Sequence, residues 1–446
     1  MALDVNSGCV HVLDELCYDI IRFLEENSAL PTDENLCRVT DSLTKYESED
    51  IKEAYEEINA LYKEGVLFSE DEYANIAANM KKHSPVKAMC LHISHDCNLR
   101  CKYCFADEGA YHQRRELMSA ETGCRAIDFL IEKSGSRKNL EVDFFGGEPL
   151  MNFEAVKAVV EYAREQEKLH DKNFRFTLTT NGVLLNDENI EYMNKEMSNV
   201  VLSLDGTKET NDRVRVKVDG SGSYESIVPK LLKVAESRNQ DSYYVRGTFT
   251  RYNLNFADDV LHLADLGFEQ TSVEPVVCDG TPDYALREED LPVLFEEYEK
   301  LAEEYVKRRK DGRWFNFFHF MIDLEQGPCV IKRLSGCGAG CEYLAVAPNG
   351  DIYPCHQFVG NEEYKMGNLS DGTINQDIRS VFEGCNVYTK PDCRDCFAKF
   401  YCSGGCMANA CLINGDINKP HKISCELERK RVECSLWARA MEAEEK

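Results

Sequence analysis

Six apolar stretches between residues 88 and 277 have the composition of buried β-strands, and amphipathic helical stretches separate them. A strand, a helix and another strand in succession are typical of a parallel sheet. Six such units predict an α/β fold, a partial (β/α)6 barrel, whose functional side chains follow the carboxyl ends of the strands. The predicted strands are residues 88–94, 140–145, 174–180, 200–204, 243–249 and 271–277.

The chain of 446 residues is long enough for several domains, and its composition changes along its length. Residues 1–80 have the pattern of a small helical unit, and residues 85–280 carry the six strand and helix units. Residues 281–334 contain an amphipathic helix at 291–310, and we interpret them as a helical connector. Residues 335–446 are rich in cysteine and have short segments, which is typical of a domain stabilised by metal centres.

The N-terminal unit carries two amphipathic helices, at 13–27 and 48–62, and two short apolar stretches, at 10–12 and 66–68, which we interpret as strands. This order predicts a winged-helix-like fold, but 19 acidic and only 5 basic side chains in residues 1–80 argue against DNA binding. The layout resembles the peptide-recognition element of enzymes that modify ribosomally made peptides. The resemblance implies that this unit binds the leader of a precursor peptide as an added strand.

The charge of the whole chain excludes further classes of partner. Lys and Arg number 52 against 79 Asp and Glu, so the net charge is −27, and nucleic acid or an anionic membrane would repel the chain. No apolar stretch reaches the roughly 18 residues of a membrane helix, and the first residues lack a secretory pattern. We therefore expect a cytoplasmic protein with no nucleic-acid or membrane partner.

The 21 cysteines indicate metal binding, because disulfides are rare in the reducing cytoplasm. Cys97, Cys101 and Cys104 form a CxxxCxxC run just after the first predicted strand. Three thiolates on one loop can hold three irons of a 4Fe–4S cube and leave the fourth iron open. The alternatives are a zinc site without its fourth ligand and cysteines gathered by chance.

This run resembles the signature of radical S-adenosylmethionine (SAM) enzymes, in which the aromatic residue of the run packs near the adenine of SAM. The GGEP sequence at 146–149 resembles the motif that holds the methionyl amino group. Arg215 resembles a basic residue near the same pocket, although a solvated surface arginine fits the sequence as well. The cofactor-binding residues implied by the resemblance are Tyr103, Gly146, Gly147, Glu148, Thr180, Asn181, Ser203 and Asp205.

The C-terminal cysteines form a second pattern, CxxCxxxxxCxxxC at 393–406, which resembles the SPASM domain with its two auxiliary 4Fe–4S clusters. The resemblance implies three clusters in the whole chain. Because Cys337 and Cys341 are closely spaced, one of them can remain unbound and leave an iron open. Two zinc sites are the alternative. The implied ligands are Cys337, Cys341, Cys355 and Cys406 for one auxiliary cluster, and Cys393, Cys396, Cys402 and Cys425 for the other.

Together the motifs resemble radical SAM/SPASM peptide maturases, most closely those that form thioethers, or sactionine bridges, in SCIFF peptides. The resemblance implies SAM and three 4Fe–4S clusters as cofactors. It also implies a Cys-rich precursor peptide with a leader, and a reductant such as flavodoxin or ferredoxin, as partners. The implied reaction joins a Cys sulfur to an acceptor α-carbon. Its catalytic residue stays open, with His356 and Arg215 as candidates.

Two other functions fit parts of the pattern. Anaerobic sulfatase maturases, which make formylglycine, have Asp directly after the cysteine of the YPC motif, whereas His356 follows Cys355 here. An iron–sulfur electron carrier would not need the GGEP motif or the polar residues at the strand ends. His356 and the acidic N-terminal unit therefore favour the thioether-forming group.

Overall fold

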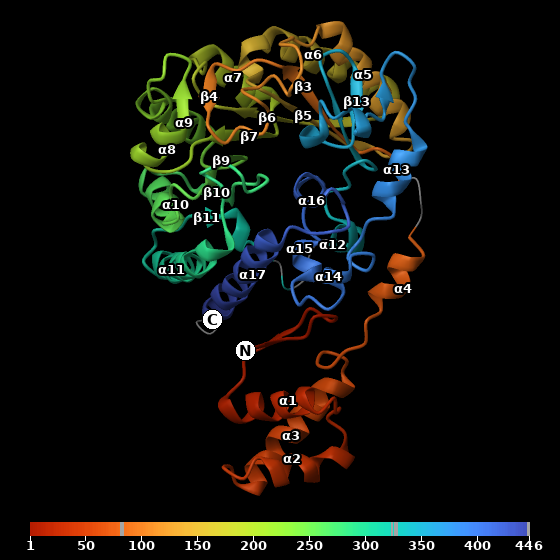
Figure 1. The fold of residues 1–446 in the computed structure, drawn as a ribbon, viewed down its shortest axis with the longest axis vertical. Coiled ribbons are helices and arrows are strands. Elements are labelled where there is room, and N and C mark those ends of the chain that lie inside the picture. Colours follow the sequence, from red (N-terminus) through yellow and green to blue (C-terminus); the bar gives the residue numbers. More distant parts are fainter. Residues whose placement is uncertain (81–83, 323, 325–328, 444–446) are drawn as a thin grey trace.

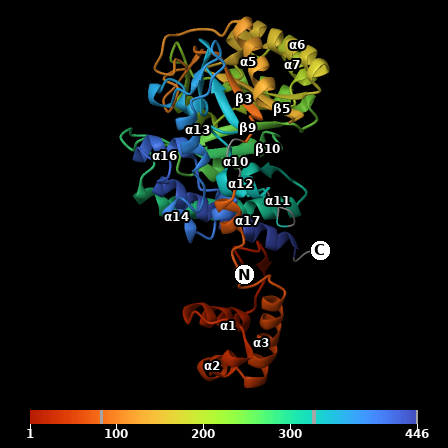
Figure 2. The ribbon, with the colours of Figure 1, turned by 90° about the vertical axis from the view of Figure 1, so that its right-hand side faces the viewer.

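The computed structural model describes residues 1–80, 84–322, 324 and 329–443. Figure 1 shows a small group of helices at the N-terminal end, a curved sheet with outer helices at the opposite end, and a C-terminal domain between them. Figure 2 shows the same order along the long axis. None of the described helices is long and apolar enough to cross a membrane.

A ten-stranded sheet forms the centre of the molecule, in the order β11-β10-β9-β7-β6-β5-β3-β12-β13-β14. Its six middle strands are parallel and neighbour one another in chain order, which confirms the predicted barrel strands to within two residues. They are β3 (Ala88–Ser94), β5 (Asn139–Gly146), β6 (Asn173–Thr180), β7 (Asn199–Ser203), β9 (Tyr243–Phe249) and β10 (Gln270–Pro275).

Helices connect these strands and cover the outer face of the sheet (Figure 1). In β6, Phe174, Phe176 and Leu178 are buried in the main core, and polar residues alternate with them. This period of two follows from the pleat, because successive side chains point to opposite faces. The helices of this part are α5 (Ala120–Lys133), α6 (Phe153–His170), α7 (Asp187–Glu196), α8 (Lys208–Val214), α9 (Tyr224–Ser237), α10 (Phe256–Asp265) and α11 (Leu291–Lys310).

Both ends of the sheet come from segments in which the sequence predicts no strand. The connector contributes β11 (Asn316–Phe317), which is parallel to β10. The C-terminal domain contributes β12 (Tyr343–Val346) parallel to β3, followed by the antiparallel strands β13 (Asp351–Tyr353) and β14 (Gly367–Asn368). The barrel and the C-terminal domain therefore share one sheet, and Cys90 of β3 lies in one buried cluster with Cys355.

The C-terminal domain is helical beyond its strands. The expectation of only short segments in this domain is wrong for α17, whose apolar residues pack into the main core of the barrel. Lys430 of α17 pairs with Glu299 of α11 at 2.5 Å, and Arg309 at the end of α11 pairs with Glu442 at 2.7 Å. The helices are α12 (Val330–Ser335), α13 (Gln376–Glu383), α14 (Pro391–Arg394), α15 (Lys399–Cys402), α16 (Met407–Asn414) and α17 (Lys422–Ala443).

The N-terminal unit contains α1 (Glu15–Glu26) and α3 (Ser48–Lys63), which confirm the two predicted helices, and α2 (Leu36–Ser42), which is not predicted from the sequence. Gly65 ends α3 with a φ of +74°, and the N–H of Val66 donates to Leu61 O at 3.1 Å. The strand predicted at 66–68 is wrong, because Phe68 has a left-handed φ of +52° that interrupts an extended backbone.

The first residues form a hairpin of β1 (Ala2–Leu3) and β2 (Val10–His11) that lies against the C-terminal domain. Leu3 and Val10 pack against Leu436 and its apolar neighbours. Asp71, just before α4 (Tyr73–Ala78), accepts a hydrogen bond from Tyr388 at 2.6 Å and pairs with Lys399 at 3.1 Å. The hairpin and α4 therefore tie the N-terminal unit to the C-terminal domain, while α1–α3 project away from it (Figure 2).

Candidate functional site

Cys97, Cys101 and Cys104 lie on the loop after β3 and line a cavity of about 270 Å³. β4 (Leu99–Cys101) within this loop pairs antiparallel with β8 (Arg215–Lys217), so Cys101 lies directly opposite Arg215. The three sulfurs are near enough for each thiolate charge to act on the others. Burial raises the pKa of Cys97 to about 11 and that of Cys101 to about 12, so both are protonated thiols at neutral pH until a metal binds them.

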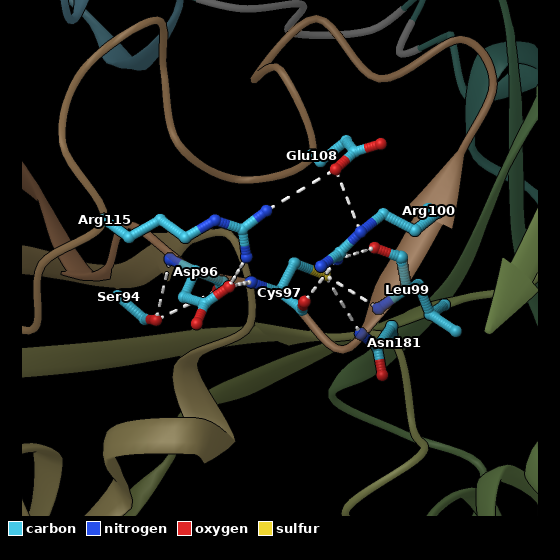
Figure 3. Close-up of polar contacts among 8 residues, drawn as sticks. All are labelled: Ser94, Asp96, Cys97, Leu99, Arg100, Glu108, Arg115 and Asn181. Carbon is cyan, nitrogen blue, oxygen red and sulfur yellow. Dashed lines mark hydrogen bonds and ion pairs between the residues drawn. The ribbon is translucent and has the colours of Figure 1, made fainter. Parts of the chain in front are cut away.

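Charged side chains hold this loop in place, as Figure 3 shows. Asp96 Oδ1 accepts a hydrogen bond from the N–H of Cys97 at 2.9 Å and pairs with Arg115. Arg100 donates to Cys97 O at 2.6 Å, and Glu108 Oε2 lies 2.9 Å from the Nε of Arg100. The sequence does not predict a role for these residues, because nothing in their spacing indicates that the loop folds back on itself.

Gly146 ends β5, Gly147 follows it, and both lie against the cysteine loop. A Cβ on Gly146 would lie 2.4 Å from Ser94 O, and Gly146 has a φ of +120°. A Cβ on Gly147 would lie 2.2 Å from Asp96 O. The close approach of two backbone segments thus requires both glycines, apart from any role toward a ligand.

Glu148 is buried behind the cavity wall and joins two strand ends. Its Oε1 accepts from Thr180 Oγ1 at 2.9 Å, and its Oε2 accepts from the N–H of Asn181 at 2.8 Å. Burial raises the pKa of Glu148, and these hydrogen bonds oppose that effect. The Nδ2 of Asn181 donates to Asn98 Oδ1 at 2.7 Å and lies 3.6 Å from Cys97 Sγ. Three of the implied cofactor-binding residues therefore form one network that reaches the cysteine loop.

Tyr103, Asp205 and Arg215 form a second buried network. The hydroxyl of Tyr103 donates to Asp205 Oδ2 at 2.7 Å and accepts from Arg215 Nη1 at 2.9 Å. Burial raises the pKa of Asp205, and the charge of Arg215 opposes this. Arg215 is only 8% exposed and lines the cavity with Ser203, so its interpretation as a solvated surface residue is wrong.

The C-terminal cysteines fall into two groups, within which the charge of one thiolate affects the pKa of its neighbours. Cys393, Cys396, Cys402 and Cys425 interact with one another, as the sequence predicts. Cys337, Cys355 and Cys406 also interact. The charges of Cys385, Glu383 and Arg379 act on the fourth implied ligand, Cys341. Cys341 packs against the same buried cluster as Cys355.

Two protein-family models match the chain. The model of the radical SAM superfamily matches residues 91–254, which hold the cysteine loop and both polar networks. An iron–sulfur cluster-binding domain, SPASM, matches residues 337–397. The chain belongs to the radical SAM superfamily. Its SPASM domain follows the radical SAM barrel, and the two domains imply SAM and iron–sulfur clusters as cofactors.

Relatives of this radical SAM chain extend over most of its length. The radical SAM cyclopropyl synthase TigE of Paramaledivibacter caminithermalis is 22% identical over 95% of this chain and 89% of that protein. A cysteine-type anaerobic sulfatase-maturating enzyme of Clostridium novyi is 24% identical over 71% of this chain and 86% of that protein. The structure of Streptococcus suis SuiB bound to its precursor peptide SuiA matches with a TM-score of 0.53 and 17% identity, over 93% of each chain.

The cavity lined by Cys97, Cys101 and Cys104 also reaches the SPASM domain. Its wall includes His356, Gln357 and Asn409 of the SPASM side, together with Arg246 and Glu274 from the ends of β9 and β10. Burial lowers the pKa of His356 to about 4, and its ring lies 5.1 Å from that of Phe145. A second cavity of about 240 Å³ shares Glu274 and Asn409 with the first and is lined by Cys402, Cys406 and Cys425.

The cysteine groups fit iron–sulfur clusters in their donor chemistry. Each group offers several thiols, and thiolates are the ligands of 4Fe–4S cubes. Among the described residues, no three His, Cys, Asp or Glu side chains are arranged to hold a single metal ion. Cys97, Cys101 and Cys104 would hold the cluster beside the polar networks.

Proposed function

We propose that this radical SAM enzyme is a peptide maturase that joins a Cys sulfur to an acceptor α-carbon in a ribosomally made, Cys-rich peptide. We further propose that SAM and three 4Fe–4S clusters are its cofactors, and that a flavodoxin or ferredoxin reduces it. The cluster of the first loop and SAM together supply a strong hydrogen-atom abstractor, and the protein supplies binding, orientation and exclusion of competing reactions.

One observation carries the proposal, namely that a single cavity is lined by the cysteine loop and by the SPASM domain. The Glu148 and Asp205 networks hold side chains in the cavity wall that can hydrogen-bond a ligand with amino, carboxylate and ribose groups, namely Thr180, Asn181, Tyr103 and Arg215. On the opposite side, His356 and Asn409 follow Cys355 and Cys406 by one and three residues. A substrate group in this cavity would therefore be within reach of both centres.

The close spacing of Cys337 and Cys341 supports the thioether reaction in particular, because one of the two can remain unbound. Three protein thiolates leave one iron of a cube without a protein ligand, and that iron can take a substrate thiolate. Forming the thioether removes a hydrogen atom from the α-carbon and a proton from the thiol. One electron then remains, and an iron–sulfur centre beside the cavity is a suitable acceptor.

The N-terminal unit supports a peptide as the substrate. Residues 1–80 carry a net charge of −14, and the hairpin β1–β2 offers short strand edges beside the SPASM domain. We propose that a leader rich in Lys or Arg binds here, since opposite charges steer association. SuiB, whose fold this chain shares, was solved with its precursor peptide bound.

Formylglycine formation is the second candidate, because a sulfatase-maturating enzyme is among the relatives. His356 favours the thioether reaction, since it takes the place of the Asp that follows the cysteine in the sulfatase-maturase pattern, and it lies in the cavity wall. The relative TigE is a cyclopropyl synthase. Like thioether formation, cyclopropane formation would retain the sulfur of every Cys.

The test is to incubate the anaerobically reconstituted enzyme with SAM, dithionite and a Cys-rich peptide that has a basic leader and is encoded beside it. The expected product is two hydrogens lighter and has one Cys that resists alkylation. The C97A/C101A/C104A variant should leave the peptide unchanged and form no 5′-deoxyadenosine. An aldehyde in place of the thiol would overturn the proposal in favour of formylglycine formation.

A further inference from the structure

Lys390 lies in the SPASM domain immediately before α14 and is only 1% exposed. Its Nζ donates to Gly404 O at 2.6 Å, and no carboxylate lies within ion-pair distance of it among the described residues. Its backbone carbonyl accepts a hydrogen bond from the N–H of Cys393 at 3.0 Å. This lysine is therefore a buried cation whose partners are a carbonyl and sulfur atoms.

The other buried lysine and arginine side chains of the described residues have a carboxylate partner. Arg308 lies 2.7 Å from Asp265, and Lys399, in the same domain as Lys390, lies 3.1 Å from Asp71. The remaining pairs are Arg379 with Glu383 at 2.9 Å and Arg215 with Asp205 at 3.9 Å. A buried ammonium is costly unless an anion compensates it. Lys390 therefore needs an anion that is not a carboxylate.

Cysteine sulfurs from both auxiliary groups surround Lys390. Burial raises the pKa of Cys393 and of Cys406, and the charge of Lys390 opposes this in each case. The same charge acts on the thiol of Cys385. Thiolates that bind iron carry the negative charge that neutral thiols lack, so loaded clusters would compensate the lysine.

The hydrogen bond to Gly404 has a second effect, because Gly404 lies two residues before Cys406. Gly404 has a φ of +84°, and an added Cβ would lie 3.3 Å from the Nζ of Lys390. The lysine thus holds the turn that links Cys402 of one group to Cys406 of the other.

We propose that Lys390 is a positioning residue for both auxiliary clusters, raising their reduction potentials by its charge and holding the loop that carries Cys406. The inference rests on the proposed assignment of Cys393 and Cys406 as ligands. A nearby positive charge stabilises the reduced, more negative state of a cluster, and charge and hydrogen bonding are among the factors that set cluster potentials.

The test uses the full-length C97A/C101A/C104A chain, so that only the auxiliary clusters give an EPR signal. Lys390→Gln removes the charge but keeps a donor for Gly404, and Lys390→Arg keeps the charge. EPR-monitored redox titration should give more negative midpoint potentials for both auxiliary clusters in Lys390→Gln. Lys390→Arg should stay near the parent. The double variant Asp71→Asn, Lys399→Gln is the matched control, because it removes a buried pair without net charge.

Unchanged potentials in Lys390→Gln at full iron content would overturn the inference. If Lys390→Gln loses iron, retention of iron in Lys390→Arg supports a role for the charge, and equal loss from both variants contradicts it. A parent chain without auxiliary iron would overturn the ligand assignment itself, which separates failure of the proposed function from failure of the role of Lys390.

Discussion

The glycines of the GGEP motif lie where β5 meets the cysteine loop, and contact between two backbones decides their identity. Gly147 has no room for a methyl group, since a Cβ there would lie 2.2 Å from Asp96 O. Its N–H donates to Ser94 O at 2.7 Å, which fixes the start of the loop that carries Cys97. The glycine therefore acts on the cluster site through the shape of the loop.

We predict that Gly147→Ala loses the iron of the first-loop cluster and keeps that of the SPASM domain, even without SAM. Overpacking of this kind costs about 1–3 kcal/mol, which the loop avoids by moving. Iron analysis and EPR spectroscopy with and without SAM would measure this. Gly384→Ala is the matched control, because its nearest contact is ordinary at 3.4 Å. Full iron with weakened SAM binding alone would instead support direct contact between Gly147 and SAM.

At the scale of elements, the sequence predicts the longer strands, whose residue pattern is regular, and does not predict the strands of two or three residues. Barrel strands such as β6 and β9 alternate buried and less buried residues over eight and seven positions, and β3 is a continuous buried stretch, so these patterns exceed chance. β4 and β8 have three residues each, and their pairing joins Cys101 to Arg215 across 114 positions of the chain. No local pattern reveals such a contact, and so the burial of Arg215 could not be predicted.

The N-terminal helices present an acidic face, because Glu53 and Glu57 of α3 are both exposed while Ile51, Ala54 and Ile58 are buried. We predict that the E53K/E57K variant binds a basic leader peptide about tenfold more weakly, since exposed ion pairs contribute about 0.2–1 kcal/mol each. Raising the salt concentration should reduce the difference from the parent.

Fluorescence anisotropy with a labelled leader peptide would measure this. The E161K/E165K variant is the matched control, because it reverses two charges at the same spacing on α6 of the barrel. Equal losses of affinity in the two variants would show that the leader responds to overall charge and does not bind the N-terminal unit.

At the scale of the whole molecule, the shared sheet explains how the reacting centres meet. β12 extends the barrel beside β3, so that Cys355 and His356 of the SPASM domain lie against the barrel interior. The cysteine motifs indicated the two domains and most of the ligand groups. They could not indicate that one cavity joins them, because that depends on strands of two to four residues at the end of the sheet.

The most direct test of the account is the origin of the hydrogen that the radical removes. Thioether formation at an α-carbon requires an α-hydrogen, whereas formylglycine formation takes a hydrogen from the β-carbon of the modified residue, and cyclopropane formation takes one from a side-chain carbon. The precursor peptide would be prepared with deuterium at its α-carbons, and 5′-deoxyadenosine would be analysed by mass spectrometry after turnover. The account predicts deuterium in 5′-deoxyadenosine and a thioether in the peptide. Unlabelled 5′-deoxyadenosine, formed together with modified peptide, would contradict it.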